Sequence, residues 1–178
     1  MTRVNNPETV SSHIFRTALL GFVIREKDID YGKCIKMGLI HDLAESVIGD
    51  LTPDQALKVD KHQLEADGVK KLCEDLPVDV ADEFTTLWNE FEDGNTKEAK
   101  LVREFDKLEM IMQAREYEID QPGVNLETFF ASTADMFTFP CTKALDERIR
   151  ATRSEHINDH LLQTDQKESG CKIEQKTE

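Results

Sequence analysis

The stretch His41-Asp42-Leu43-Ala44-Glu45-Ser46-Val47-Ile48-Gly49-Asp50 sets a histidine and an aspartate side by side in an otherwise apolar run. As a helix it puts Glu45 on the face of His41 and Asp42, because residues three and four apart are neighbours. The chain then leaves the helix with Asp50 beside its end. Burying several unpaired carboxylates is costly, and a divalent cation with nitrogen and oxygen ligands would offset that cost. A metal site is one interpretation of this stretch; the other is a surface helix whose polar face is acidic, which is the commoner case for an isolated His-Asp pair.

The composition limits the classes of partner. The chain has 178 residues, with 36 acidic and 22 basic side chains and a net charge of −14. This length suits one domain with a substantial core. The negative charge opposes binding to nucleic acid polymers and anionic membranes, although a cation in a site would still allow a small nucleotide to bind.

The four cysteines are widely scattered and include no C-x-x-C pair, which favours reduced thiols over a zinc site or a disulfide framework. No apolar run approaches the roughly 18 residues that span a bilayer. The first residues also lack the hydrophobic segment of a secretory signal. We therefore expect a cytoplasmic protein.

Apolar residues recur at helical spacing along most of the chain, and no segment alternates convincingly like a β-strand. We therefore expect an all-α fold. The first helix carries an apolar stripe from Val10 to Val23 that includes Phe15, Leu19 and Phe22. The expected helices begin near residue 7 and continue over residues 30–48, 58–74, 80–91, 97–119, 126–134 and 142–152.

The expected domain covers residues 1–152, and a polar, flexible tail covers residues 153–178. The tail contains His156 and His160 at metal-ligand spacing, but no apolar segment nearby could wall a site.

Two further residues fit a metal site once they are read together with the first stretch. His13 lies on the first expected helix, and Asp106 interrupts the apolar stripe of the 97–119 helix. Taken singly, His13 is a typical surface or core histidine and Asp106 a typical flank residue. The order of a lone His, a His-Asp pair and a distant Asp is more informative than any one of them.

This order resembles the HD-domain metal-dependent phosphohydrolases, in particular the branch of HD domain-containing protein 2 and the 5′-deoxynucleotidases. The similarity covers about residues 4–150, and it implies a single HD-domain helical bundle. Three motifs carry it: Pro7-Glu8-Thr9-Val10-Ser11-Ser12-His13, the stretch 41–50, and Asp106-Lys107-Leu108-Glu109-Met110 with Gln113-Ala114 and Glu116-Tyr117-Glu118.

The resemblance implies that His13, His41, Asp42 and Asp106 hold one divalent cation, which could be Mn²⁺, Co²⁺, Mg²⁺, Zn²⁺ or Fe²⁺.

The resemblance also assigns roles to the acids after the His-Asp pair. Glu45 and Asp50 would handle the attacking water, or would bind a second cation with the backbone carbonyl of Leu51. The implied reaction converts a deoxynucleoside 5′-monophosphate to the deoxynucleoside and phosphate. Family members are commonly dimers, so we also expect a homodimer.

One departure from the family pattern concerns the substrate phosphate. Relatives carry an Arg-x-Gly-Trp segment upstream of the Pro-Glu stretch, whereas this sequence starts at Met1 and Arg3 does not match that arginine. Three alternatives to the 5′-deoxynucleotidase stay open, and only the module without efficient turnover is suggested by this departure. The chain could hydrolyse a cyclic nucleotide or a nucleoside polyphosphate, it could be a metal-bound module that binds a nucleotide or partner without efficient turnover, or it could be a metal-free helical scaffold.

Overall fold

The structure is a computed structural model that describes residues 4–48 and 60–155. In these residues all regular secondary structure is helical, which confirms the expected all-α fold. The helices in chain order are α1 (Val10–Val23), α2 (Tyr31–Ile40), α3 (Glu45–Ile48), α5 (Lys61–Cys73), α6 (Val78–Asp93), α7 (Lys97–Asp120) and α8 (Glu127–Ser132). A further helix follows over residues 140–155.

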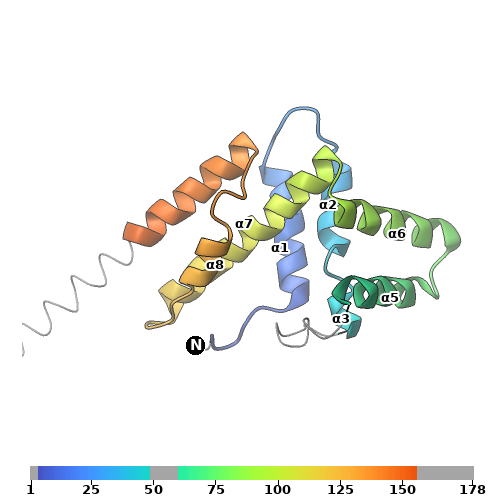
Figure 1. Ribbon diagram of the computed structural model, residues 1–178, viewed down its shortest axis with the longest axis horizontal. Coiled ribbons are helices and arrows are strands. Elements are labelled where there is room, and N and C mark those ends of the chain that lie inside the picture. Colours follow the sequence, from blue (N-terminus) through green and yellow to red (C-terminus); the bar gives the residue numbers. More distant parts are fainter. Residues whose placement is uncertain (1–3, 49–59, 156–178) are drawn as a thin grey trace, which may run out of the picture.

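Helices α1, α2 and α7 form the centre of the bundle and contact one another in all three pairs. In Figure 1, α7 crosses the molecule obliquely between two groups of helices. Helices α3, α5 and α6 lie on one side, whereas α8 and the helix over residues 140–155 lie on the other. The two groups are therefore held together through the central three helices.

The His-Asp stretch does not form the continuous helix expected over residues 30–48. Helix α2 begins after its N-cap Asp30 as expected, but it ends at Ile40, and His41 is its C-cap residue. Residues 41–44 form a turn, in which the amide of Leu43 donates to the carbonyl of Ile40, and α3 begins at Glu45. The apolar run gave no sign of this break, since no proline or glycine lies between Leu39 and Ile48.

Helices α1 and α2 pack unusually closely at Gly38. A Cβ atom at this position would lie 3.0 Å from the Cα atom and 3.1 Å from the backbone nitrogen of Ala18. Because the contact is with backbone, no flexible side chain could move aside for a larger residue. The absence of a side chain at Gly38 thus lets the two helices that carry His13 and His41 approach each other.

The apolar stripe predicted on α1 is only partly buried. Ile14, Ala18 and Leu20 lie in the core, but Phe15 and Phe22 are each 60% exposed. The buried face of α1 also includes Thr17 and Gly21, which are small enough for close packing against α2. The stripe is therefore helical as predicted, but its largest side chains lie on the surface.

Buried Glu104 of α7 caps the start of the 140–155 helix. Its Oε1 accepts hydrogen bonds from the amide (2.9 Å) and the hydroxyl (2.6 Å) of Thr138. Its Oε2 accepts from the amide of Phe139 at 3.3 Å and from the hydroxyl of Thr142. This carboxylate satisfies polar groups at the helix start that would otherwise lack partners.

The same helix is held at its other end by Arg153. The guanidinium of Arg153 pairs with Glu118 of α7 and Glu127 of α8, each at 2.6 Å. The helix therefore runs past residue 153, where the polar tail was expected to begin; the predicted tail from residue 156 onward, with His156 and His160, lies outside the described residues. None of the described helices is both long enough and apolar enough to cross a membrane.

Replacing Glu104 with Gln should destabilise the fold. The amide can accept at one position only, so the amide of Phe139 would lose its acceptor. We expect a loss of about 1 to 3 kcal/mol in the free energy of unfolding, measured by urea denaturation. Glu147→Gln, on the exposed part of the same helix, is the control and should change it by less than about 0.5 kcal/mol; equal effects of the two substitutions would contradict the capping role.

Candidate metal centre

Four residues predicted as metal ligands meet where α1, α2 and α7 converge. His13 lies on α1, His41 and Asp42 follow α2, and Asp106 lies on α7. One ligand atom from each of the four lies within 4.8 Å of the others. The structure thus brings together side chains that are 93 positions apart at the extremes of the sequence, from residue 13 to residue 106.

The ring of His41 is oriented by the backbone of its own helix. Its Nδ1 lies 2.9 Å from the carbonyl oxygen of Gly38, which can only accept, so Nδ1 carries the proton. Its Nε2 is buried and makes no hydrogen bond within the described residues. A buried nitrogen lone pair without a donor is unusual in a folded protein, and here it points toward Asp42, whose Oδ2 lies 3.4 Å away.

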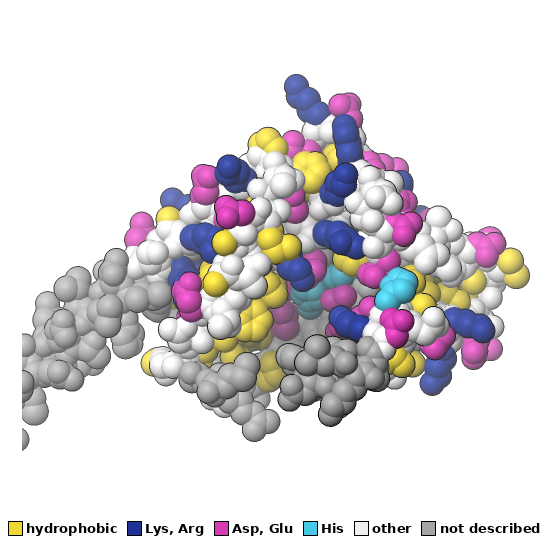
Figure 2. Space-filling view, viewed as in Figure 1, with side chains coloured by type: hydrophobic (Ala, Val, Ile, Leu, Met, Phe, Trp, Pro, Cys, Tyr) yellow, Lys and Arg dark blue, Asp and Glu magenta, His cyan; other side chains and the backbone are white. Residues whose placement is uncertain are grey.

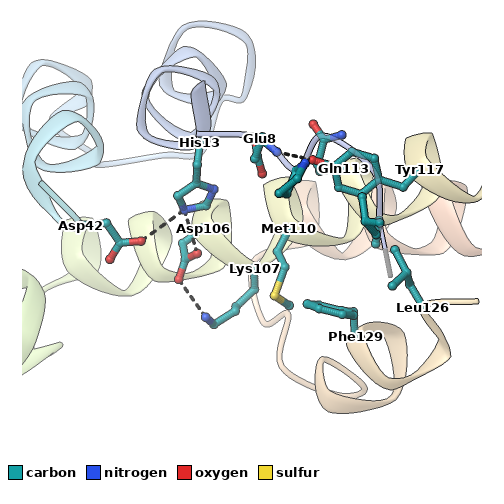
Figure 3. A pocket seen from close by; sticks show the side chains of 13 residues that line it. Glu8, His13, Asp42, Asp106, Lys107, Met110, Gln113, Tyr117, Leu126 and Phe129 are labelled. Carbon is teal, nitrogen blue, oxygen red and sulfur yellow. Dashed lines mark hydrogen bonds and ion pairs between the residues drawn. The ribbon is translucent and has the colours of Figure 1, made fainter. Parts of the chain in front are cut away.

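The ring of His13 is oriented in a similar way by a carboxylate. Its Nδ1 lies 2.6 Å from Oε2 of Glu109, and its Nε2 lies 3.4 Å from Oδ2 of Asp42 and 3.3 Å from Oδ1 of Asp106. Both histidines therefore turn Nε2 toward Asp42, and His13 also turns it toward Asp106 (Figure 3 shows His13). The ring centroids of the two histidines are 5.4 Å apart.

The carboxylates give the centre an excess of negative charge. Burial alone would lower the pKa of His13, but its hydrogen bonds with Asp106, Asp42 and Glu109 outweigh burial and raise that pKa to about 12. Burial opposes ionisation of Asp42, yet the two histidines hold its pKa well below the ordinary value. Asp106, although buried, also has a lowered pKa because of His13 and Lys107. The centre thus favours a positive charge between its carboxylates.

These residues fit a divalent cation. The unpartnered Nε2 of His41, the matching orientation of His13 and the two ionised aspartates form a set of two nitrogen and two oxygen donors. Imidazole with carboxylate is a donor set that first-row divalent metals accept. In each histidine the other ring nitrogen is already held by an acceptor, as is usual for metal-binding histidines.

A pocket of about 380 Å³ opens beside the four residues. Figure 3 shows the histidine and the two aspartates at one end and Met110 and Phe129 farther along. The apolar part of the lining consists mainly of Met110, Ala114, Leu126 and Phe129. In the space-filling view of Figure 2, histidine side chains lie recessed in a hollow that apolar side chains border on one side.

Lys107 is the one lysine or arginine among the described residues that line this pocket. Its ammonium lies 3.0 Å from Oδ2 of Asp106, and the side chain is 38% exposed. It therefore stands at the junction between the metal centre and the pocket. Lys107 lies in the third motif of the sequence but was assigned no role there, because its place beside the pocket depends on the fold.

Of the two acids expected beside the first cation, Glu45 and Asp50, only Glu45 lies among the described residues. Glu45 is the first residue of α3, and its Oε1 lies 3.7 Å from the ammonium of Lys61. It is not one of the four residues whose ligand atoms converge. Asp50 and Leu51 lie outside the described residues, so their expected roles stay predictions.

Comparison with known proteins identifies the family. A profile described as the HD domain matches residues 1–145. The chain belongs to the HD-domain family. Among its HD-domain relatives, the 5′-deoxynucleotidase HDDC2 of Dictyostelium discoideum is 42% identical over 164 residues, covering 84% of this chain and 86% of that protein. The human 5′-deoxynucleotidase HDDC2 is 37% identical over 156 residues, covering 86% of this chain and 76% of that protein.

A solved structure with a similar fold agrees with this assignment. The PH0347 protein from Pyrococcus horikoshii OT3 superposes with a TM-score of 0.68 at 33% identity, covering 85% of this chain and 86% of that one. The resemblance inferred from the three motifs is therefore confirmed at the level of the family and the fold.

Replacing Asp106 with Ala should weaken cation binding, because it removes one of the four converging donors. We expect the loss of Mn²⁺ affinity to exceed the roughly 10- to 100-fold typical of a residue that only supports a ligand. Titration calorimetry on chelator-treated protein measures it. Asp82→Ala, on the exposed face of α6, is the control; an unchanged Mn²⁺ affinity in Asp106→Ala would remove this residue from the site.

Proposed function

We propose that this protein is a metal-dependent 5′-deoxynucleotidase, a phosphomonoester hydrolase that converts deoxynucleoside 5′-monophosphates to deoxynucleosides and phosphate. The observation that carries the proposal is the position of the His/Asp centre at one end of an apolar pocket. The centre suits a phosphate group and the pocket suits the nucleoside attached to it. The names of the HD-domain relatives support the same substrate class.

In this proposal His13, His41, Asp42 and Asp106 hold the cation, whether Mn²⁺, Co²⁺, Mg²⁺, Zn²⁺ or Fe²⁺. When bound, such a cation lowers the pKa of a coordinated water and neutralises charge that builds on the phosphoryl oxygens. The chain supplies the remaining functions: it places the phosphate, packs against the nucleoside and takes up the proton of the attacking water.

Lys107 is the group that we assign to the substrate phosphate. Its ammonium reaches Asp106 on the metal side and lines the pocket on the other, so a phosphate bound at the centre would lie within its reach. An ammonium binds phosphate as a compact point charge.

Glu45 and Asp50 are the acids that we assign to the water. Glu45 begins α3 immediately after the turn that carries Asp42, and a carboxylate there can accept the proton that the attacking water loses. Asp50 would share this role or, with the Leu51 carbonyl, would bind a second cation.

We also propose that the protein acts in the cytoplasm as a homodimer. The three described cysteines are free of disulfides, which suits a reducing compartment. Phe15, Leu19, Phe22 and Val23 are exposed and lie on one face of α1. A second copy of the chain would cover this apolar face.

The proposed activity predicts phosphate release from dAMP, dCMP, dGMP and dTMP that exceeds release from their ribose counterparts. Activity should disappear after chelation and return with Mn²⁺, Co²⁺ or Mg²⁺, because the donors converge on one cation. A colorimetric phosphate assay measures it. Cation binding without phosphate release would favour the alternative, a nucleotide- or partner-binding module without turnover.

Glu45→Ala tests the role of this carboxylate in the same assay. It should abolish turnover while the protein keeps its first cation, since Glu45 lies outside the four converging residues. Equal turnover in wild type and Glu45→Ala would refute the role assigned to this carboxylate.

Lys107→Ala should weaken binding of the monophosphate. A charge-assisted hydrogen bond is worth about 1.5 to 3 kcal/mol, so we expect KM to rise about 10-fold or more in steady-state kinetics. Lys97→Ala, which removes an exposed lysine from the first turn of the same helix, is the matched control. A KM that stays the same in both variants would contradict the assignment.

A further inference from the structure

Glu109 is the most deeply buried acid that contacts the metal centre, and the residues so far assigned to the reaction leave it without a role. Its side chain is 1% exposed. It projects from α7 three residues after Asp106, so both carboxylates leave the same face of the helix. Burying a carboxylate is costly unless its charge is matched and its oxygens are engaged. The partners of Glu109 therefore indicate why it is there.

The two oxygens of Glu109 contact two different residues of α1. Oε2 lies 2.6 Å from Nδ1 of His13, a short, charge-assisted contact. Oε1 forms an ion pair with Nε of Arg16 at 2.9 Å. His13 and Arg16 are three positions apart on one face of α1, so a single carboxylate bridges both to α7.

Arg16 is itself held by several acceptors. Its two terminal nitrogens donate to the two oxygens of Glu116 at 3.0 and 3.1 Å, and one of them also donates to the side chain of Gln113. This fork-to-fork geometry restricts the guanidinium far more than a single contact would. The Arg16 guanidinium, itself held in place, therefore fixes the position of Glu109 on the side away from His13.

Glu8, His13 and Glu109 also bring ligand atoms within 4.8 Å of one another, which raises the alternative of another cation at this place. Two observations oppose it. The Nδ1 of His13 is already bonded to Glu109, and the guanidinium of Arg16 already supplies positive charge to that carboxylate. We therefore interpret Glu109 as a residue that orients His13, and we do not interpret these three residues as a separate metal site.

We propose that Glu109 is a positioning residue that fixes the tautomer and the ring orientation of His13, and that Arg16 holds Glu109 in place for this purpose. The inference rests on the proposed metal centre. With Nδ1 protonated and bonded to Glu109, the lone pair of His13 is confined to Nε2, which faces Asp42 and Asp106. The bond also raises the basicity of the ligand nitrogen, and partners of this kind support many metal-binding histidines.

The test is cation binding by Glu109→Gln, which keeps the size of the side chain but removes its charge. We expect Mn²⁺ affinity, measured by titration calorimetry on chelator-treated protein, to fall about 10- to 100-fold. The visible absorption spectrum of the Co²⁺-loaded protein should also change, because it reports the donor geometry around the ion. Neither readout depends on turnover.

Glu104→Gln is the matched control, because it neutralises another buried glutamate of α7, whose hydrogen bonds within the described part of the chain go to residues 138–142. It should lower stability but leave the Mn²⁺ affinity within about 2-fold of the wild type and the Co²⁺ spectrum unchanged. Loss of a residue that supports a metal ligand should instead lower the Mn²⁺ affinity by at least about 10-fold. A general loss of packing would instead affect both variants alike, and that result would overturn the proposal.

Wild-type Mn²⁺ affinity and an unaltered Co²⁺ spectrum in folded Glu109→Gln would also overturn it. If this variant does not fold, Arg16→Met replaces it, because the Arg16 side chain is partly exposed and its loss frees Glu109 on one side. Reduced Mn²⁺ affinity in Arg16→Met supports the proposal, and unchanged affinity overturns it. Should the protein show no phosphate release at all, these binding measurements would still decide the role of Glu109.

Discussion

Two imidazoles and two ionised aspartates share a small volume where α1, α2 and α7 meet, and their charges require a positive partner. Without a cation, the centre draws a proton onto His13, whose pKa rises to about 12 although burial opposes it. A divalent cation meets the same need with more charge and with ligands already in place. The packing of α1, α2 and α7 therefore determines whether these four side chains can hold a cation together.

Each of the two histidines is oriented by a hydrogen bond at Nδ1, but the acceptors differ. His41 is held by the carbonyl of Gly38, within its own helix, so its geometry is local. His13 is held by Glu109, which belongs to another helix, so its geometry depends on how α1 packs against α7. The close approach of α2 to Ala18 at Gly38 links the two arrangements. A change in helix packing should thus disturb His13 before it disturbs His41.

Much of the fold and of the centre could be predicted, because helical periodicity and three spaced motifs are properties of the sequence alone. The break after Ile40 could not, since the apolar run continues through it and only tertiary packing selects the turn. The exposure of Phe15 and Phe22 could not be predicted either, because periodicity identifies an apolar face but does not reveal which neighbour covers it. Glu109 and Lys107 both lie in the third motif, but their separate roles could not be predicted from it, since their contacts depend on how α7 packs.

Helix α7 carries carboxylates that act on separate parts of the molecule. Glu104 faces residues 138–142, Asp106 and Glu109 face the centre, and Glu118 faces Arg153. Each residue turns the helix by about 100°, so inserting or deleting one position between Glu104 and Glu118 would misalign every contact beyond it. The loops of this protein can therefore change in length more readily than α7. The number of residues in α7 must stay fixed for its carboxylates to reach residues 138–142, the metal centre and Arg153 together.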